Sequence, residues 1–169
     1  MGYEPTLVQE LAISETDHCL EVFQKLTNNT NIIICIGVPI HQSAGICISM
    51  IIFQPNMPRI VYSKQILHVD EYPYFISGKE PIFISYKDHK IAPAICFESL
   101  PNEHAATASA HGADIYLASV VKSAKGVEKV NLHYTEIAKN LSLTVLMANA
   151  IGPSDDFMSA GNSAVWNEY

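Results

Sequence analysis

The chain alternates between apolar runs and short polar turns, and its longest apolar runs lie in the first third. They read IIICIGVPI at 32–40 and GICISMIIF at 45–53, and a short polar turn containing Gly45 joins them. A further extended piece, IVYSK, occupies 60–64. Runs of this length that are rich in β-branched residues and bounded by turn residues are typical of strands. The pattern therefore predicts a β-hairpin followed by a third strand.

A helix is predicted before these strands. The letters SETD at 14–17 form a capping-box pattern, in which the first and fourth side chains each bond the other residue's backbone N–H. The apolar face expected for this helix consists of Cys19, Val22, Phe23 and Leu26. The Asn-rich stretch 28–31 is expected to end the helix.

In the second half of the chain, strand patterns alternate with helix patterns. PIFISYKDHKIAPAICF at 81–97 predicts a hairpin that turns at Asp88 and His89. The elements expected after it are an Ala-rich helix from Pro101 to about Gly112, a strand at 114–120, a helix at 127–141, a strand at 144–152 and the start of a strand at 163–166. Hairpins that alternate with β–α–β crossovers predict a layered α/β protein with a mixed sheet.

Composition and charge narrow the class of protein. The 169 residues suffice for one domain, 1–169, and a chain that is 49% hydrophobic and 16% charged should bury an extensive core and a subunit interface. The net charge is −7 and no basic run occurs, so nucleic acid is not expected as a partner. The apolar runs are too short to span a bilayer and no secretory leader follows Met1, so we expect a cytoplasmic protein without a membrane anchor.

The cysteines and histidines do not form a metal or disulfide pattern. The four cysteines, none of them in a C-x-x-C pair, are Cys19, Cys35, Cys47 and Cys96. Neither a zinc site nor a disulfide framework is predicted, and the seven histidines lack metal-ligand spacing. We expect no metal and no cofactor.

Cys96 differs from the other cysteines in its position. It ends the buried strand AICF, and a helix begins a few residues later. A thiol there can feel unpaired backbone N–H groups and the positive end of a helix dipole, which lower a thiol pKa, and the same N–H groups can bind an oxyanion. On position alone, a small buried core residue remains the commoner role for a cysteine.

Lys64 ends an apolar extended run, and Glu71 follows seven residues later. A lysine at the end of a strand is usually a solvated edge charge. It can also be a fixed cation that stabilises a developing oxyanion and a nearby thiolate, with a carboxylate that keeps it protonated and oriented. The alternative for Glu71 is that it caps a turn together with Asp70.

Several stretches together carry a resemblance to a known family. They are GYEP at 2–5, YSKQILHVDE at 62–71, PAICFESLPNEHAATASAHGADIYL at 93–117, EIAKNLSLTVLMANAIG at 136–152 and GNSAVW at 161–166. In order and spacing they resemble the carbon–nitrogen hydrolases of the nitrilase superfamily. The resemblance implies an α-β-β-α sandwich that hydrolyses a non-peptide C–N bond in a small-molecule amide or nitrile, amides being the commoner substrates. It also implies a homo-oligomer in the intact form.

The resemblance further implies roles for individual residues. Cys96 would be the nucleophile that forms a thioester, and the Lys64 ammonium and the Phe97 backbone N–H would hold the oxyanion. Glu71 would position Lys64 or help to handle the proton.

The resemblance also implies that the chain is truncated at both ends, because it begins at the Gly-Tyr turn that follows the family's general-base glutamate. The first strand and the C-terminal strands of the sandwich would be missing, and neither Glu4 nor Glu10 matches the position of the base. One alternative is therefore a non-catalytic truncated member or regulatory subunit of the same fold. A second is a Cys–His thiol hydrolase whose base is a histidine such as His104, His111 or His133.

Overall fold

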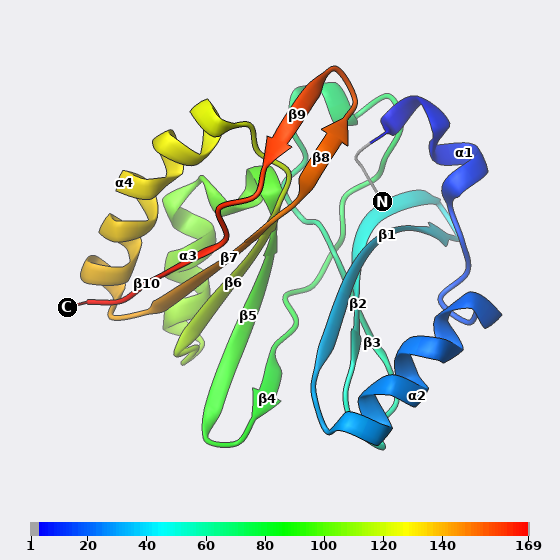
Figure 1. The fold of residues 1–169 in the computed structure, drawn as a ribbon, viewed down its shortest axis with the longest axis horizontal. Helices are drawn as coiled ribbons and strands as arrows, with labels where there is room; N and C mark the ends of the chain where they lie inside the picture. The colour runs from blue at the N-terminus through cyan, green and yellow to red at the C-terminus, as the bar shows by residue number, and fades with distance from the viewer. Residues whose placement is uncertain (1–3, 169) are drawn as a thin grey trace. The chain divides into compact units, whose positions relative to one another are not determined.

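The computed structural model describes residues 4–168, and the chain divides into two compact units. The unit called here the N-terminal unit is Thr6–Glu80. The C-terminal unit comprises Pro81–Tyr169 together with Met1–Pro5. Each unit contains a sheet with helices beside it (Figure 1). Residues 2 and 3 of the GYEP stretch lie outside the described residues.

The N-terminal unit is built on a three-stranded antiparallel sheet of order β1-β2-β3. Its strands are β1 (Ile34–Gln42), β2 (Gly45–Phe53) and β3 (Ile60–Ser63), and its helices are α1 (Val8–Leu11) and α2 (Glu21–Thr30). The β1–β2 register pairs Ile34 with Phe53 and Gln42 with Gly45, so two residues form the turn. The predicted hairpin and third strand are confirmed.

Helix α2 covers one face of this sheet (Figure 1), although its start and its apolar face differ from the prediction. The capping residue is Asp17, not Ser14, and its carboxylate accepts the Cys19 N–H at 2.9 Å before a 3-10 turn that leads into α2. Phe23 packs against the core, but Val22 and Leu26 are exposed. The core beneath the helix consists of Leu20, Val38, Ile40, Ile51 and Phe53.

The C-terminal unit is built on a mixed five-stranded sheet of order β10-β7-β6-β5-β4. Its strands are β4 (Ile84–Tyr86), β5 (His89–Ile95), β6 (Ile115–Val120), β7 (Thr144–Asn149) and β10 (Ala164–Trp166), its helices are α3 (Asn102–Ala110) and α4 (Ala124–Leu141), and β8 (Ile151–Ser154) and β9 (Phe157–Ala160) form a separate hairpin. Strands β5, β6 and β7 are parallel, whereas β4 and β10 are antiparallel to their neighbours. The predicted mixed α/β architecture is confirmed.

Alternate residues of the three parallel strands build the core of this unit. One face of the sheet contributes Ala92, Ala94, Tyr116, Ala118, Val145 and Met147, and buried residues of α3 and α4 pack against it. The alanines on β5 and α3 keep this contact close, and the larger tyrosine, valine and methionine side chains fill the space beside them.

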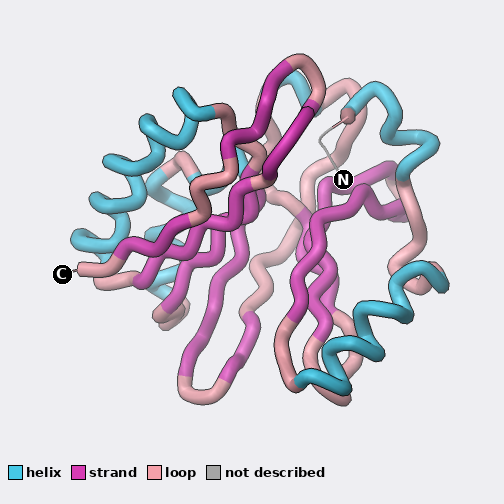
Figure 2. The backbone as a smooth tube through the Cα atoms, in the orientation of Figure 1, coloured by secondary structure: helices cyan, strands magenta, loops and turns pink. Residues whose placement is uncertain are grey.

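Three predicted boundaries in this unit are wrong. The β4–β5 turn lies at Lys87 and Asp88, one residue earlier than expected. Helix α4 begins three residues before the predicted start, because the Ser123 hydroxyl caps it by accepting the Gly126 N–H. The strand expected at 144–152 is two strands, β7 and β8, with Ala150 between them. Figure 2 draws both in the strand colour. Within residues 4–168, every helix is too short or too polar to cross a bilayer.

Candidate active site

Cys96 lies at the carboxyl-terminal edge of the parallel strands in the C-terminal unit. Strands β5, β6 and β7 run in the same direction, so the residues that follow Ile95, Val120 and Asn149 share one edge of the sheet. Ligands of open α/β sheets usually bind at this edge. Cys96 is half-buried and begins a 3-10 turn, Cys96–Ser99, directly after β5.

The backbone of Cys96 is left-handed, with φ of 51°. A non-glycine residue rarely adopts this conformation, because its Cβ crowds the following carbonyl oxygen. Strain of this kind persists only where the surroundings hold it, and it clusters at functional sites. The sharp turn ends the strand at the cysteine, and α3 begins six residues later at Asn102.

The Glu98 side chain stabilises the start of this turn. Its side chain is fully buried, and Oε1 accepts the backbone N–H of Ile95 at 2.6 Å. Oε2 lies 3.9 Å from Nε2 of His104, whose Nδ1 is 2.7 Å from the Tyr116 hydroxyl. Burial lowers the pKa of His104 below its ordinary value of 6.5, although the Glu98 charge opposes the shift. At neutral pH the imidazole in this contact is therefore neutral.

Ser99 holds the far side of the turn. Its hydroxyl donates to the carbonyl oxygen of Cys96 at 2.6 Å and lies 2.7 Å from the hydroxyl of Tyr134 on α4. The carbonyl oxygen of Ser99 is 3.1 Å from Nε2 of His133. Burial raises the pKa of Tyr134 to about 12, so its hydroxyl stays protonated at neutral pH. The 3-10 turn is thus fixed to α4 through two adjacent helical side chains.

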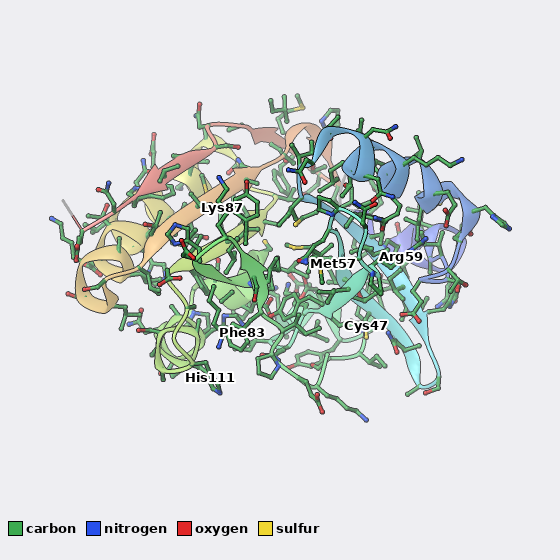
Figure 3. All side chains as sticks on the ribbon, turned by 90° about the horizontal axis from the view of Figure 1, so that it is seen from below. Cys47, Met57, Arg59, Phe83, Lys87 and His111 are labelled. Atoms are coloured by element: carbon green, nitrogen blue, oxygen red, sulfur yellow. The ribbon has the colours of Figure 1, made fainter. Side chains whose placement is uncertain are left out.

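Each of the three histidines considered as a base in the Cys–His alternative makes a specific contact within the C-terminal unit. His104 lies between Tyr116 and Glu98, and His133 contacts the carbonyl oxygen of Ser99. His111 bonds the carbonyl of Thr107 and stacks on Phe83 with 5.6 Å between ring centroids; both rings are labelled in Figure 3. Each ring has a structural role within the C-terminal unit.

Asn149, which the sequence analysis did not select, joins two loops at the same edge of the sheet. Its Oδ1 accepts the Lys122 N–H at 2.8 Å, and its Nδ2 donates to the carbonyl oxygens of Lys122 and Gly161 at 3.0 and 2.7 Å. All hydrogen-bonding atoms of this buried amide are thereby engaged. In the sequence, Asn149 could have been identified as an Asn at the end of a buried apolar strand, because an unpaired amide there would be energetically costly.

Lys64 and Glu71 form a buried ion pair in the N-terminal unit. Lys64 follows β3 and is 1% exposed, and its Nζ lies 2.6 and 2.7 Å from the two carboxylate oxygens of Glu71. Glu71 also accepts the backbone N–H of His68 at 2.7 Å. The alternative of a solvated edge charge for Lys64 is therefore wrong. Glu71 pairs with Lys64 and also caps a turn.

The backbone on either side of Lys64 is also held. Its N–H donates to the carbonyl oxygen of Ile48 at 2.8 Å, and its carbonyl oxygen accepts the Gly78 N–H at 2.7 Å. The structure thus joins Lys64 to Glu71 in one unit and places Cys96 beside Phe97 in the other. Among the described residues, no three His, Cys, Asp or Glu side chains converge as metal ligands would.

Comparisons with known proteins agree with this fold. The carbon–nitrogen hydrolase family model matches residues 1–169. The NitN amidase of Nesterenkonia sp. AN1 superposes with a TM-score of 0.86 at 18% identity, over 99% of this chain and 68% of the amidase. A CN-hydrolase superfamily protein of Xanthomonas campestris, with an arsenic adduct in its active site, superposes with a TM-score of 0.87 at 14% identity, over 99% of this chain and 66% of that protein.

A curated relative matches at the level of sequence. The glutamine-dependent NAD(+) synthetase of Aquifex aeolicus is 24% identical over 97% of this chain, and the chain spans 30% of that enzyme.

Proposed function

The chain belongs to the carbon–nitrogen hydrolase family, and on that premise we propose that it hydrolyses the amide bond of a small molecule through a thioester on Cys96. Lys64 and the Phe97 backbone N–H serve as the oxyanion stabilisers, and Glu71 keeps Lys64 charged and oriented. The general base is assigned to no residue of this chain.

The proposed reaction has two stages. The Cys96 thiolate attacks the amide carbon, a C–S bond forms, and the carbonyl electron pair moves to oxygen. When the C=O bond re-forms, the C–N bond breaks and the nitrogen leaves with a proton as ammonia or an amine. Water then adds to the thioester, which releases a carboxylic acid and restores the thiol.

The observation that carries the proposal is the left-handed backbone of Cys96 at the end of β5. Glycine would adopt this backbone conformation without strain, so a cysteine at this position indicates that its side chain is needed. The backbone N–H of Phe97 follows Cys96 directly in this turn, and backbone donors at such turns can bind an oxyanion. The assignment of Lys64 to the same substrate rests on the order and spacing of the two sequence motifs.

The Lys64–Glu71 pair suits the role given to it. An ammonium that is 1% exposed and held by both oxygens of one carboxylate is a preorganised cation, which needs no rearrangement as negative charge develops. A solvated lysine would lose much of that effect to water.

Short primary amides are the substrate class that we propose. One mutant of the Nesterenkonia amidase carries the acetamide moiety of fluoroacetamide on its active-site cysteine, and another mutant was solved in complex with butyramide. The name of the glutamine-dependent NAD(+) synthetase adds glutamine, itself a primary amide, as a second candidate.

The test measures ammonia released by the purified protein from acetamide, butyramide and glutamine, and traps the acyl enzyme for mass spectrometry. We expect ammonia release to depend on Cys96 and to be lost in Cys96→Ser. The matched control is Cys35→Ser, because Cys35 is also half-buried and burial raises the pKa of its thiol to about 11. This control should retain the activity.

The alternative is a non-catalytic member or regulatory subunit of the same fold. It predicts that Cys96 reacts with acylating reagents no faster than Cys19, Cys35 or Cys47, and that no ammonia is released. That pair of results would exclude the proposed reaction for this chain.

A further inference from the structure

The hydrogen bond from Ser99 to Cys96 fixes more than a turn. A peptide unit is planar and trans, so its C=O and N–H groups point in opposite directions. The carbonyl oxygen of Cys96 and the N–H of Phe97 belong to the same peptide unit. Since the Ser99 hydroxyl donates to this oxygen at 2.6 Å, it also fixes the direction of the Phe97 N–H.

The donor and acceptor roles follow from counting protons. Ser99 has one hydroxyl proton, and it donates this proton in the hydrogen bond to the carbonyl oxygen of Cys96. The 2.7 Å contact between the Ser99 and Tyr134 hydroxyls therefore requires Tyr134 to donate. Burial raises the pKa of Tyr134 to about 12, which keeps this proton in place at neutral pH.

We propose that Ser99 and Tyr134 form a positioning relay, from the Tyr134 hydroxyl through the Ser99 hydroxyl to the Cys96 carbonyl, that orients and polarises the Phe97 N–H for an oxyanion. Hydrogen bonds in such a chain strengthen one another, and an amide whose carbonyl accepts a strong bond is a better donor at its N–H. The inference rests on the proposed function, because the oxyanion arises in that reaction.

The relay predicts a selective effect on two reactions of the same thiol. Acylation by p-nitrophenyl acetate passes through an oxyanion: the thiolate adds to the carbonyl carbon, and p-nitrophenolate leaves as the C=O bond re-forms. Methyl methanethiosulfonate instead exchanges with the thiolate, so that a methyl disulfide forms and methanesulfinate leaves, without a carbonyl addition. Only the first reaction should need the oriented N–H.

The experiment measures both rates at Cys96 by peptide mass spectrometry on the full chain, with Cys96→Ser as background. In Ser99→Ala we expect acylation to slow by about tenfold, near the upper end of what one hydrogen bond contributes, while methylthiolation stays unchanged. Loss of a whole oxyanion donor costs more, about 10²–10³-fold, and here the donor remains but is less well held.

Three further variants separate the relay from simple damage to the turn. Tyr134→Phe keeps the ring that contacts Trp166 and removes only the donor, so it should slow acylation less than Ser99→Ala. Ser99→Thr keeps the hydroxyl and should keep the rate. In the double variant Ser99→Ala with Tyr134→Phe, acylation should be no slower than in Ser99→Ala alone, because the relay is already broken.

The matched control is Tyr116→Phe. It removes the hydroxyl of another buried tyrosine of the same unit, one that bonds His104, and the ratio of the two rates should not change.

Each other outcome overturns the relay. Equal slowing of acylation and methylthiolation would mean that the substitution only loosens the turn. Unchanged rates in both reactions would mean that the Ser99 bond is irrelevant to the N–H. If Cys96 of the unmodified protein is acylated no faster than Cys35, the proposed function fails and the relay fails with it.

Discussion

The Lys64–Glu71 pair allows the sharpest quantitative prediction for the N-terminal unit. The side chains of Lys64 and Glu71 are 1% and 7% exposed, and the ammonium meets both carboxylate oxygens. Glu71→Gln keeps the shape of the side chain and an oxygen that can accept the His68 N–H. The substitution therefore removes the negative charge and leaves Lys64 as an uncompensated buried cation.

Removal of one partner of a buried pair typically costs about 3–5 kcal/mol. For a protein of this length, that loss corresponds to a decrease in Tm of about 6–20 °C. It would consume a large part of the total stability of an ordinary domain, which is about 5–15 kcal/mol. Chemical denaturation in urea at neutral pH, followed by circular dichroism, measures the change directly.

The double variant Lys64→Met with Glu71→Gln provides the decisive comparison. Replacement of a whole buried ion pair by uncharged side chains removes both charge-desolvation costs together, and with apolar side chains the net change in stability is often close to zero. We therefore expect the double variant to be more stable than Glu71→Gln alone. The reasoning is refuted if Glu71→Gln costs less than about 1 kcal/mol, the usual size for an exposed pair, or if the second substitution restores nothing.

Three further predictions concern single positions. Gly78→Ala should lower the urea midpoint by the equivalent of about 1–3 kcal/mol, because a Cβ there would collide with the Ser63 carbonyl. The control is Gly37→Ala, which should change the midpoint little because the space around Gly37 is open. Asn149→Ala should lower the stability measured by thermal unfolding by about 1–3 kcal/mol, because it leaves the backbone partners of the amide unpaired. A loss smaller than that of an exposed Asn→Ala control would contradict this prediction. Burial lowers the pKa of His104 in the folded state. As the pH falls, the unfolded chain therefore takes up this proton at a higher pH than the folded chain does. The free energy of unfolding should consequently decrease as the pH drops below 6.5. His104→Gln should flatten that decrease in a urea series.

The sequence predicts an element well where an apolar run has clear boundaries. The run at 45–53 coincides with β2 at both ends, since Gly45 and the polar segment after Phe53 bound it. The run at 144–152 has no such boundary inside it, and at Ala150 the chain changes partner: its N–H still bonds the carbonyl oxygen of Val120 in β6, whereas its own carbonyl oxygen accepts the N–H of Gly161, just after β9. These contacts join residues far apart in sequence, which a local pattern does not contain.

The sequence selected the candidate site residues but did not predict their surroundings. Residue type and spacing selected Lys64, Glu71 and Cys96, yet the burial of Lys64 depends on how residues 65–80 fold over it. Propensity favours an exposed lysine, and tertiary packing overrides it here. The backbone angle of Cys96 is also absent from any hydrophobic pattern, because the pattern reports which face a residue occupies and not its φ.

The strain at Cys96 can itself be tested through the sign of a difference. At φ of 51° a Cβ is unfavourable, so Cys96→Gly should be more stable than Cys96→Ala, by about 1 kcal/mol. At an ordinary strand position the order is reversed, because glycine there loses more backbone entropy. Ser142, which ends α4 with φ of 50°, provides a matched pair of variants with the same expected order. If urea denaturation finds Cys96→Ala the more stable while the Ser142 pair follows expectation, the turn is not left-handed, and the strain that supports Cys96 as the nucleophile is absent.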